Sequence, residues 1–231
     1  MIEHVYRRAK AAGLDRVVVL TDDSRIADTV NGFGGDVEMT PEHCATGTDR
    51  IAFAARNWDC DALVNIQGDE PLIDPAAIAK VAGQLRSTED PLVTLASLES
   101  AADVESPHVV KVVCDVNSHA LYFSRSTIPF ARGERGNVLR HIGIYGYRRA
   151  TLLRLSDLPQ AELEKSEALE QLRALAHGIP IRVLIHDRVA LGVDTPEDIQ
   201  RVEKYLDENP PEDDWGEFGV GEWDRPQGSP S

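Results

Sequence analysis

The stretch Asp61-Ala62-Leu63-Val64-Asn65-Ile66-Gln67-Gly68-Asp69-Glu70-Pro71 decides the fold of this chain. Its first six residues include the apolar Ala62, Leu63, Val64 and Ile66, and a short apolar run of this kind is typical of a buried strand in a parallel sheet. Asp69 follows that strand at the edge where open α/β sheets bind ligands, and its carboxylate suits a hard divalent cation. A helix-capping loop with surface acids explains the same residues, so the pattern alone leaves both interpretations open.

Strand and helix patterns alternate on both sides of this stretch. Further strands are predicted at residues 16–20, 36–39, 92–98, 142–147 and 181–185. Helices are predicted at residues 2–12, 48–57, 75–87, 149–156 and 162–177. Short apolar runs separated by helices predict an α/β protein with three layers (α/β/α) and a mostly parallel central sheet. Residues 109–114 and 120–123 flank a polar turn and predict a hairpin, within an antiparallel insertion at about residues 107–148.

Composition excludes several classes of protein. The 231 residues carry a net charge of −15, of which −7 lies in residues 207–231. We therefore expect a folded domain over residues 1–206 and an acidic, disordered tail over residues 207–231. No basic patch is present to bind nucleic acid, and no apolar run is long enough to span a membrane. The first residues lack the pattern of a signal peptide, so we expect a cytoplasmic protein.

A second acidic segment and one polar strand are further candidates for a site. Asp194 precedes Thr195 and Pro196, which form a well-defined helix start, so capping alone explains its position. If Asp69 and Asp194 share one Mg²⁺, they bring a nucleotide phosphate and a hydroxyl together. His141 and Tyr145 lie on one face of the strand near residue 145, where they suit a polyhydroxylated acid. A buried, hydrogen-bonded histidine in an ordinary strand is the alternative.

The order of the motifs is more specific than any one of them. They occupy residues 67–71, 122–129, 139–147, 169–173 and 192–198. Together they resemble the 3-deoxy-D-manno-octulosonate (Kdo) cytidylyltransferases, from Met1 to about Leu206. This resemblance implies a nucleotidyltransferase-like fold, a homodimer, and transfer of CMP from CTP to the anomeric hydroxyl of Kdo for lipopolysaccharide synthesis.

The resemblance also implies roles for individual residues. Asp69 and Asp194 would be the catalytic residues that bind Mg²⁺. The residues expected to contact the sugar, or to lie beside the substrates, are Gln67, Arg125, His141, Tyr145, Glu170 and Gln171. Those expected on the nucleotide side are Thr21, Asp22, Thr46, Gly47 and Thr48. Arg125 and His141 are expected to attract the carboxylate of the sugar.

One departure from the family bears on activity. Its members begin with a strand and a loop of the form ARxxSxRLPxKPL that holds the CTP phosphates, whereas residues 1–5 here resemble the helix after that loop. We therefore expect this chain by itself to be poorly active. The alternatives are a cytidylyltransferase for 8-amino-Kdo or a sialic acid, a non-catalytic sugar-binding protein, and a metal-dependent glycosyltransferase. The last needs a DxD motif after a strand, which the sequence lacks.

Overall fold

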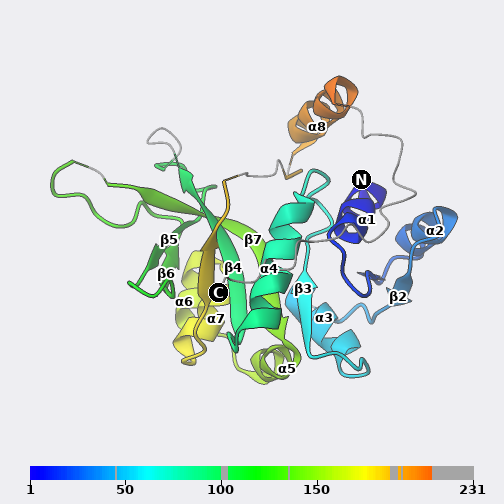
Figure 1. Ribbon diagram of the computed structural model, residues 1–231, viewed down its shortest axis with the longest axis horizontal. Helices are drawn as coiled ribbons and strands as arrows, with labels where there is room; N and C mark the ends of the chain where they lie inside the picture. The colour runs from blue at the N-terminus through cyan, green and yellow to red at the C-terminus, as the bar shows by residue number, and fades with distance from the viewer. Residues whose placement is uncertain (45, 100–103, 135, 188–191, 194, 210–231) are drawn as a thin grey trace, which may run out of the picture.

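The computed structural model describes every residue except 45, 100–103, 135, 188–191, 194 and 210–231 (Figure 1). The strands are β1 (Val19–Thr21), β2 (Val37–Met39), β3 (Ala62–Asn65), β4 (Leu92–Glu99), β5 (Lys111–Cys114), β6 (Ala120–Ser124), β7 (Val138–Arg148) and β8 (Arg182–Ile185). The helices are α1 (Ile2–Ala11), α2 (Ser24–Gly32), α3 (Gly47–Ala55), α4 (Pro75–Ser87), α5 (Arg149–Asp157), α6 (Glu162–Glu167), α7 (Gln171–Ala176) and α8 (Pro196–Glu208). No described helix is both long and apolar enough to cross a membrane.

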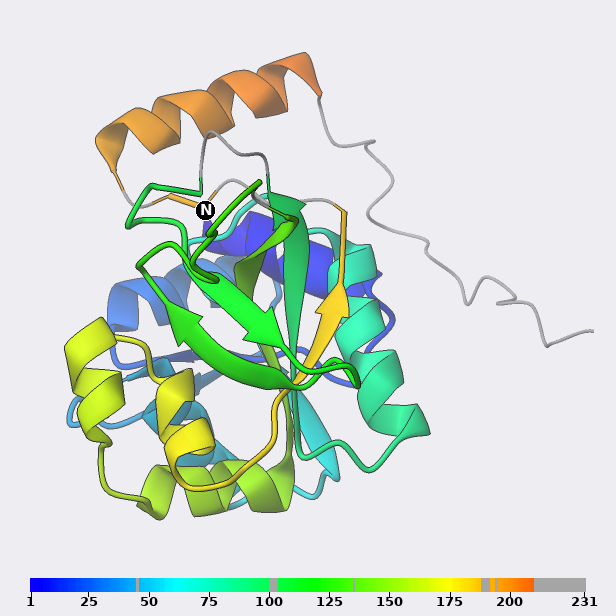
Figure 2. The same ribbon diagram turned by 90° about the vertical axis from the view of Figure 1, so that its left-hand side faces the viewer.

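The strands form two sheets. β1 and β2 pair in parallel, and a six-stranded sheet has the order β6-β5-β7-β4-β8 with β3 also paired to β7. β3, β4 and β8 run in the same direction, as predicted, but β7 lies antiparallel between β3 and β4. The sheet is therefore mixed in its pairings rather than mostly parallel. The predicted hairpin is confirmed as β5 and β6, which Figure 2 shows beside α6 and α7.

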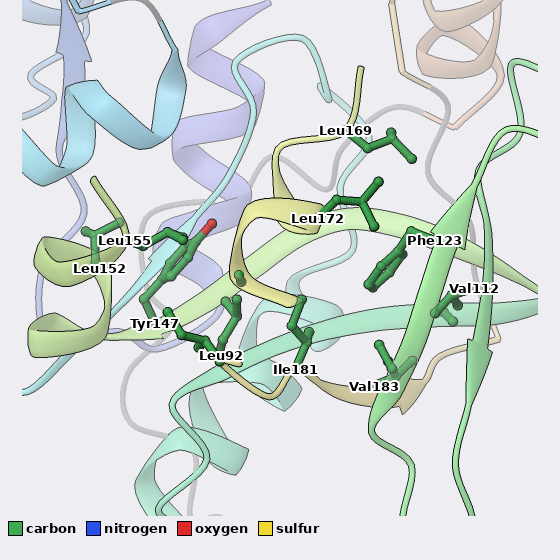
Figure 3. Packing of buried hydrophobic residues seen from close by; sticks show 14 of the residues in the cluster. Leu92, Val112, Phe123, Tyr147, Leu152, Leu155, Leu169, Leu172, Ile181 and Val183 are labelled. Carbon is green, nitrogen blue, oxygen red and sulfur yellow. The ribbon is translucent and has the colours of Figure 1, made fainter. Parts of the chain in front are cut away.

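Two apolar clusters cover the two faces of the larger sheet. Because side chains alternate along a strand, Leu92 and Ala96 of β4 face one cluster while Val93 and Leu95 face the other. The first cluster includes residues of α3, α5 and α7, and Figure 3 shows Leu155 and Leu172 packed near Tyr147 and Phe123. The second includes residues of α1 and α4. The three-layer α/β/α fold is thus confirmed.

A groove separates the two sheets. Its volume is about 1050 Å³, and it is lined by β1 with the residues that precede it and by β3. In Figure 1, α1, α2 and β2 lie together on the side of β3 away from β5 and β6. The predicted strand at 16–20 is shorter than expected, since β1 begins at Val19 and pairs only with β2.

The predicted helix at 162–177 is wrong as a single helix. α6 ends at Glu167; the next residue, Ala168, has a left-handed backbone conformation with φ of 52°, and α7 then begins at Gln171. This conformation is costly for a residue with a Cβ, and no glycine marks it in the sequence. The break brings Glu170 and Gln171 to the start of a separate short helix. At the end of the chain, α8 runs to Glu208, and most of the predicted tail, residues 210–231, lies outside the described residues.

Candidate active site

The start of α3 lies beside the carboxyl end of β3. Thr46 caps the helix, since its Oγ1 accepts a hydrogen bond of 3.1 Å from the N–H of Asp49. A side chain on Gly47 would lie 3.9 Å from atoms of both Asn65 and Gln67. The predicted nucleotide-side residues Thr46 and Gly47 are therefore adjacent to Gln67, the residue predicted to lie beside the substrates.

A small polar cavity lies between β3, β7, α3 and α7. Its volume is about 30 Å³. The predicted site residues that line it are Thr48, Gln67, Tyr145, Glu170 and Gln171. Thr48 donates a hydrogen bond of 2.7 Å from Oγ1 to Glu170 Oε2, which joins α3 to the start of α7. Residues more than 100 positions apart in the sequence thus contact one another here.

Three further polar residues of this cavity were not predicted. Asn65, Tyr147 and Arg173 also line it. Asn65 is the last residue of β3 and is buried, so its amide is held at the carboxyl end of the strand. Its place two residues before Gln67, within the segment of residues 61–71, is a sequence signal that could have identified it.

β7 contains an irregularity that brings two predicted residues together. Thr94 pairs with Tyr145, but the next residue of β4, Leu95, pairs with Ile142, so β7 bulges between them. The His141 and Tyr145 rings are 5.4 Å apart, and Thr94 Oγ1 lies 2.9 Å from His141 Nε2. Thr94, which is fully buried, was missed because an isolated threonine in a strand pattern has no functional signature.

His141 is neutral in this environment. Phe123 packs edge-on against its ring at 5.0 Å, and burial lowers its pKa to about 3. A neutral His141 does not attract a sugar carboxylate by charge, so its predicted role in sugar binding rests on hydrogen bonding. A neutral imidazole next to Thr94 contributes a hydrogen bond instead. Burial likewise raises the pKa of the Tyr145 and Tyr147 hydroxyls, so both stay protonated.

Arg125 is held at the end of β6 by backbone oxygens. Its Nε donates to the Glu167 C=O at 2.9 Å, and its Nη1 donates to the Pro107 C=O at 3.3 Å. The Glu167 carboxylate in turn accepts from Ser124 Oγ at 2.6 Å and from the Arg125 N–H at 3.0 Å. Burial alone would raise the pKa of Glu167, but these hydrogen bonds keep that pKa below its ordinary value.

Lys111, which was not predicted, also helps to hold the backbone at Arg125. It is fully buried, and its Nζ donates to the carbonyls of Ser106, Val109 and Arg125. Burial lowers the pKa of its ammonium group. Lys111 and Glu167 therefore fix the backbone of Arg125 from two directions.

Asp69 lies just beyond β3 and is exposed. Its backbone carbonyl accepts a hydrogen bond of 2.9 Å from the N–H of Val193, so the second acidic segment runs against the first. Asp194 itself lies outside the described residues. Among the described residues, no group of three or more His, Cys, Asp or Glu side chains forms a potential metal site. An exposed carboxylate fits Mg²⁺, which keeps several water ligands.

Thr21 and Asp22 lie across the groove from β3. Thr21 is buried, and its Oγ1 accepts from the N–H of Asp23 at the start of α2. Asp22 pairs with Arg50 of α3 at 2.9 Å, and this hydrogen bond lowers its pKa. Both residues are therefore tied into the structure, and the pair of Asp22 with Arg50 connects the end of β1 to α3.

The low pKa of His141 predicts a pH dependence of stability. The unfolded histidine takes up a proton below about pH 6.5, whereas the folded one stays neutral down to about pH 3. The free energy of unfolding should therefore fall on acidification below pH 6.5, by at most about 1.4 kcal/mol per pH unit from this group. In urea titrations between pH 6.5 and 5, His141→Gln should remove that slope. The exposed His108→Gln serves as the control, and equal slopes for both variants would contradict the prediction.

Comparisons with known proteins agree with this geometry. A family model described as "Cytidylyltransferase" matches residues 1–183. The chain is 50% identical over 221 residues to the 3-deoxy-manno-octulosonate cytidylyltransferase of Syntrophotalea carbinolica, covering 89% of this chain and 88% of that protein. It is 50% identical over 210 residues to the enzyme of the same name from Myxococcus xanthus, covering 89% and 85%.

A solved structure shares the fold closely. It is CMP:2-keto-3-deoxy-manno-octonic acid synthetase complexed with CTP, with a TM-score of 0.87 and 40% identity over 90% of this chain and 88% of that one. An inositol-1-phosphate CTP transferase from T. maritima shares only the fold, at 17% identity, 90% and 82% coverage and a TM-score of 0.61. On the family model and the identity of its relatives, the chain belongs to the 3-deoxy-manno-octulosonate cytidylyltransferase family of cytidylyltransferases.

Proposed function

We propose that this protein transfers CMP from CTP to the anomeric hydroxyl of Kdo and releases pyrophosphate. The observation that carries the proposal is the meeting of Gln67, Thr48, Tyr145 and Glu170 at one polar cavity, at the carboxyl end of β3. Relatives named for this reaction are 50% identical to the chain. A related structure at 40% identity is described as complexed with CTP.

The reaction is an in-line displacement in which the sugar hydroxyl attacks the α-phosphorus of CTP. Asp69 and Asp194 would hold Mg²⁺, which neutralises charge on the phosphate and lowers the pKa of the attacking hydroxyl. The exposure of Asp69 and the hydrogen bond between its C=O and Val193 support this pairing. Positioning of the two substrates then supplies the rest of the catalysis.

The hydroxyl groups of the sugar would be bound by neutral groups. Tyr145 stays protonated and His141 stays neutral, so each offers a hydrogen bond to a sugar hydroxyl without carrying a charge. Glu170 and Gln171 are at the start of α7, where the break after α6 directs them toward Tyr145. Such a site suits a polyhydroxylated substrate, because each hydroxyl both donates and accepts.

The sugar carboxylate would be bound by Arg125. Guanidinium groups bind carboxylates through paired hydrogen bonds, and those bonds are stronger than neutral ones. Since His141 is neutral, Arg125 is the cation that we assign to this task. Glu167 and Lys111 act as positioning residues that hold the backbone beneath it.

We also propose which sugar the protein uses and how its chains assemble. The relatives' names favour Kdo over 8-amino-Kdo and sialic acid. We propose a homodimer acting in the cytoplasm. The exposed side chains of Leu121 and Phe130, on and near the edge strand β6, support an interface on the antiparallel part of the fold.

The reaction can be tested directly by following CMP-Kdo formation from CTP, Mg²⁺ and Kdo over long incubations, since we expect this chain by itself to be poorly active. Asp69→Asn should lower the rate by at least about 100-fold, because the developing charge loses its metal ligand. Glu197→Gln, an exposed change in the first turn of α8, should leave the rate unchanged. Kdo should be used faster than 8-amino-Kdo or a sialic acid.

Two results would count against the reaction. If the unchanged protein binds Kdo but forms product no faster than Asp69→Asn, it is a sugar-binding protein without catalysis. If 8-amino-Kdo is the better substrate, the assignment of the sugar is wrong while the reaction type stands.

The positioning role of Glu167 predicts a selective loss of sugar binding. Glu167→Gln replaces one acceptor oxygen with an amide donor and leaves the Ser124 hydroxyl or the Arg125 N–H without its partner. The Kd for Kdo, measured by calorimetry, should rise by about tenfold. The Kd for CTP should stay the same. Glu162→Gln, an exposed change on the same helix, is the control, and a rise in both constants would indicate general unfolding instead.

A further inference from the structure

One buried ion pair joins the two short helices beside the polar cavity. α6 and α7 have six residues each, so neither is long enough to be stable alone. Arg173 of α7 donates to Glu164 of α6 from Nε to Oε2 at 2.9 Å and from Nη2 to Oε1 at 2.6 Å. Their side chains are only 11% and 2% exposed. Because paired bonds of this kind fix both groups in direction, they constrain how α7 lies against α6.

Both carboxylate oxygens of Glu164 are engaged in the folded protein. Besides Arg173, its Oε2 accepts from the N–H of Ala161 at the start of α6, at 3.1 Å. Burial alone would raise the pKa of Glu164, but the hydrogen bonds from Arg173 and Ala161 hold that pKa below its ordinary value. Glu164 therefore stays ionised inside the fold, where Arg173 neutralises it.

Glu170 is a second carboxylate within reach of the same guanidinium. Arg173 follows Glu170 by three residues, and side chains at that spacing are neighbours on a helix surface. Both residues line the polar cavity. The hydrogen bonds with Glu164 raise the pKa of the Arg173 guanidinium most, and the charges of Asp49 and Glu170 raise it further. Arg173 would therefore be free to pair with Glu170 if Glu164 did not hold it.

The start of α7 is instead left open to other partners. Glu170 Oε2 accepts from Thr48 Oγ1 at 2.7 Å, and in the part of the chain that the structure describes no side-chain hydrogen bond joins Arg173 to Glu170. The neighbouring Gln171 is buried and lines the cavity, yet its Nε2 has no hydrogen-bond partner among the described residues. A buried donor without a partner is costly, which indicates that a ligand supplies an acceptor there.

We propose that Glu164 is a positioning residue for the sugar and acts through Arg173. It holds the guanidinium away from Glu170, so the Glu170 carboxylate is left to accept hydrogen bonds from Thr48 and from hydroxyls of the substrate. The inference rests on the proposed function, since it takes Glu170 and Gln171 to contact Kdo. Without the charge of Glu164, the guanidinium would bind Glu170 and occupy the acceptor that the sugar needs.

The test first removes the charge of Glu164 and then removes the released cation. Glu164→Gln keeps the volume and an acceptor for the Ala161 N–H but no longer neutralises Arg173. The Kd for Kdo, measured by calorimetry, should rise by about tenfold, while the Kd for CTP stays the same. Adding Arg173→Met removes the competitor for Glu170, and the Kd for Kdo should return to within about twofold of its original value.

A crystal structure of the Glu164→Gln variant without substrate supplies a second readout. It should place the Arg173 guanidinium within hydrogen-bond distance of the Glu170 carboxylate, and an unmoved guanidinium would overturn the proposal. Glu162→Gln is the matched control, because it breaks the exposed pair with Lys165 on the same helix. This control should change neither Kd.

The outcomes separate this inference from the proposed function. If the unchanged protein does not bind Kdo, the proposed sugar is wrong, and the crystal structure alone decides whether Glu164 restrains Arg173. An equal Kd for Kdo in the unchanged protein and in Glu164→Gln would overturn the inference. So would weak binding that persists in the double variant, because Glu164 would then serve only the packing of α6. The double variant buries no unpaired charge, so it decides the question even if Glu164→Gln alone does not fold.

Discussion

The insertion of β7 between β3 and β4 is the constraint on which the rest of the structure depends. This strand pairs with β3, β4 and β5, so it joins the α/β core to the antiparallel hairpin. Its bulge opposite Thr94 sets His141 beside Tyr145, and its far end carries Tyr147 toward α3 and α7. Shifting its register by one residue would turn each of these side chains to the opposite face.

Charge is distributed unequally around the cavity. His141, Tyr145 and Tyr147 on β7 are neutral because burial holds the imidazole unprotonated and the tyrosine hydroxyls protonated. Glu170 and Arg173 line the cavity beside the two tyrosines, whereas Asp69 follows β3 and Arg125 follows β6. In the proposed function the neutral groups bind sugar hydroxyls, while Arg125 and Asp69 serve the carboxylate and the metal.

The sequence predicted the elements whose signals are local. α4 begins and ends where its capping Asp74 and apolar spacing indicate, and the helix start at Thr195 and Pro196 has the expected capping box. The antiparallel placement of β7 could not be read from its sequence, because a buried strand has the same composition in either direction. The turn at Ala168 was missed because a left-handed residue is usually marked by glycine.

The sequence predicted the site residues that lie in recognisable motifs. It missed the residues whose role depends only on contacts made in the folded protein. Gln67, Tyr145 and Glu170 came from recognisable segments. Thr94 and Lys111 gain their roles through contacts between separate segments, with His141 for the first and with the carbonyl of Arg125 for the second. The neutral state of His141 could not be predicted from the sequence, because its desolvation depends on Phe123 and the other neighbours that folding supplies.

The central claim is that Kdo binds against β7, and intermolecular NOEs between Kdo and tyrosine-labelled protein test it most directly. The five tyrosines of the protein act as reporters at separate places, and Tyr6 and Tyr205 lie on α1 and α8. The account predicts NOEs from the sugar protons to the Tyr145 ring and none to Tyr6 or Tyr205. NOEs to either of those two helices, with none to Tyr145, would contradict it.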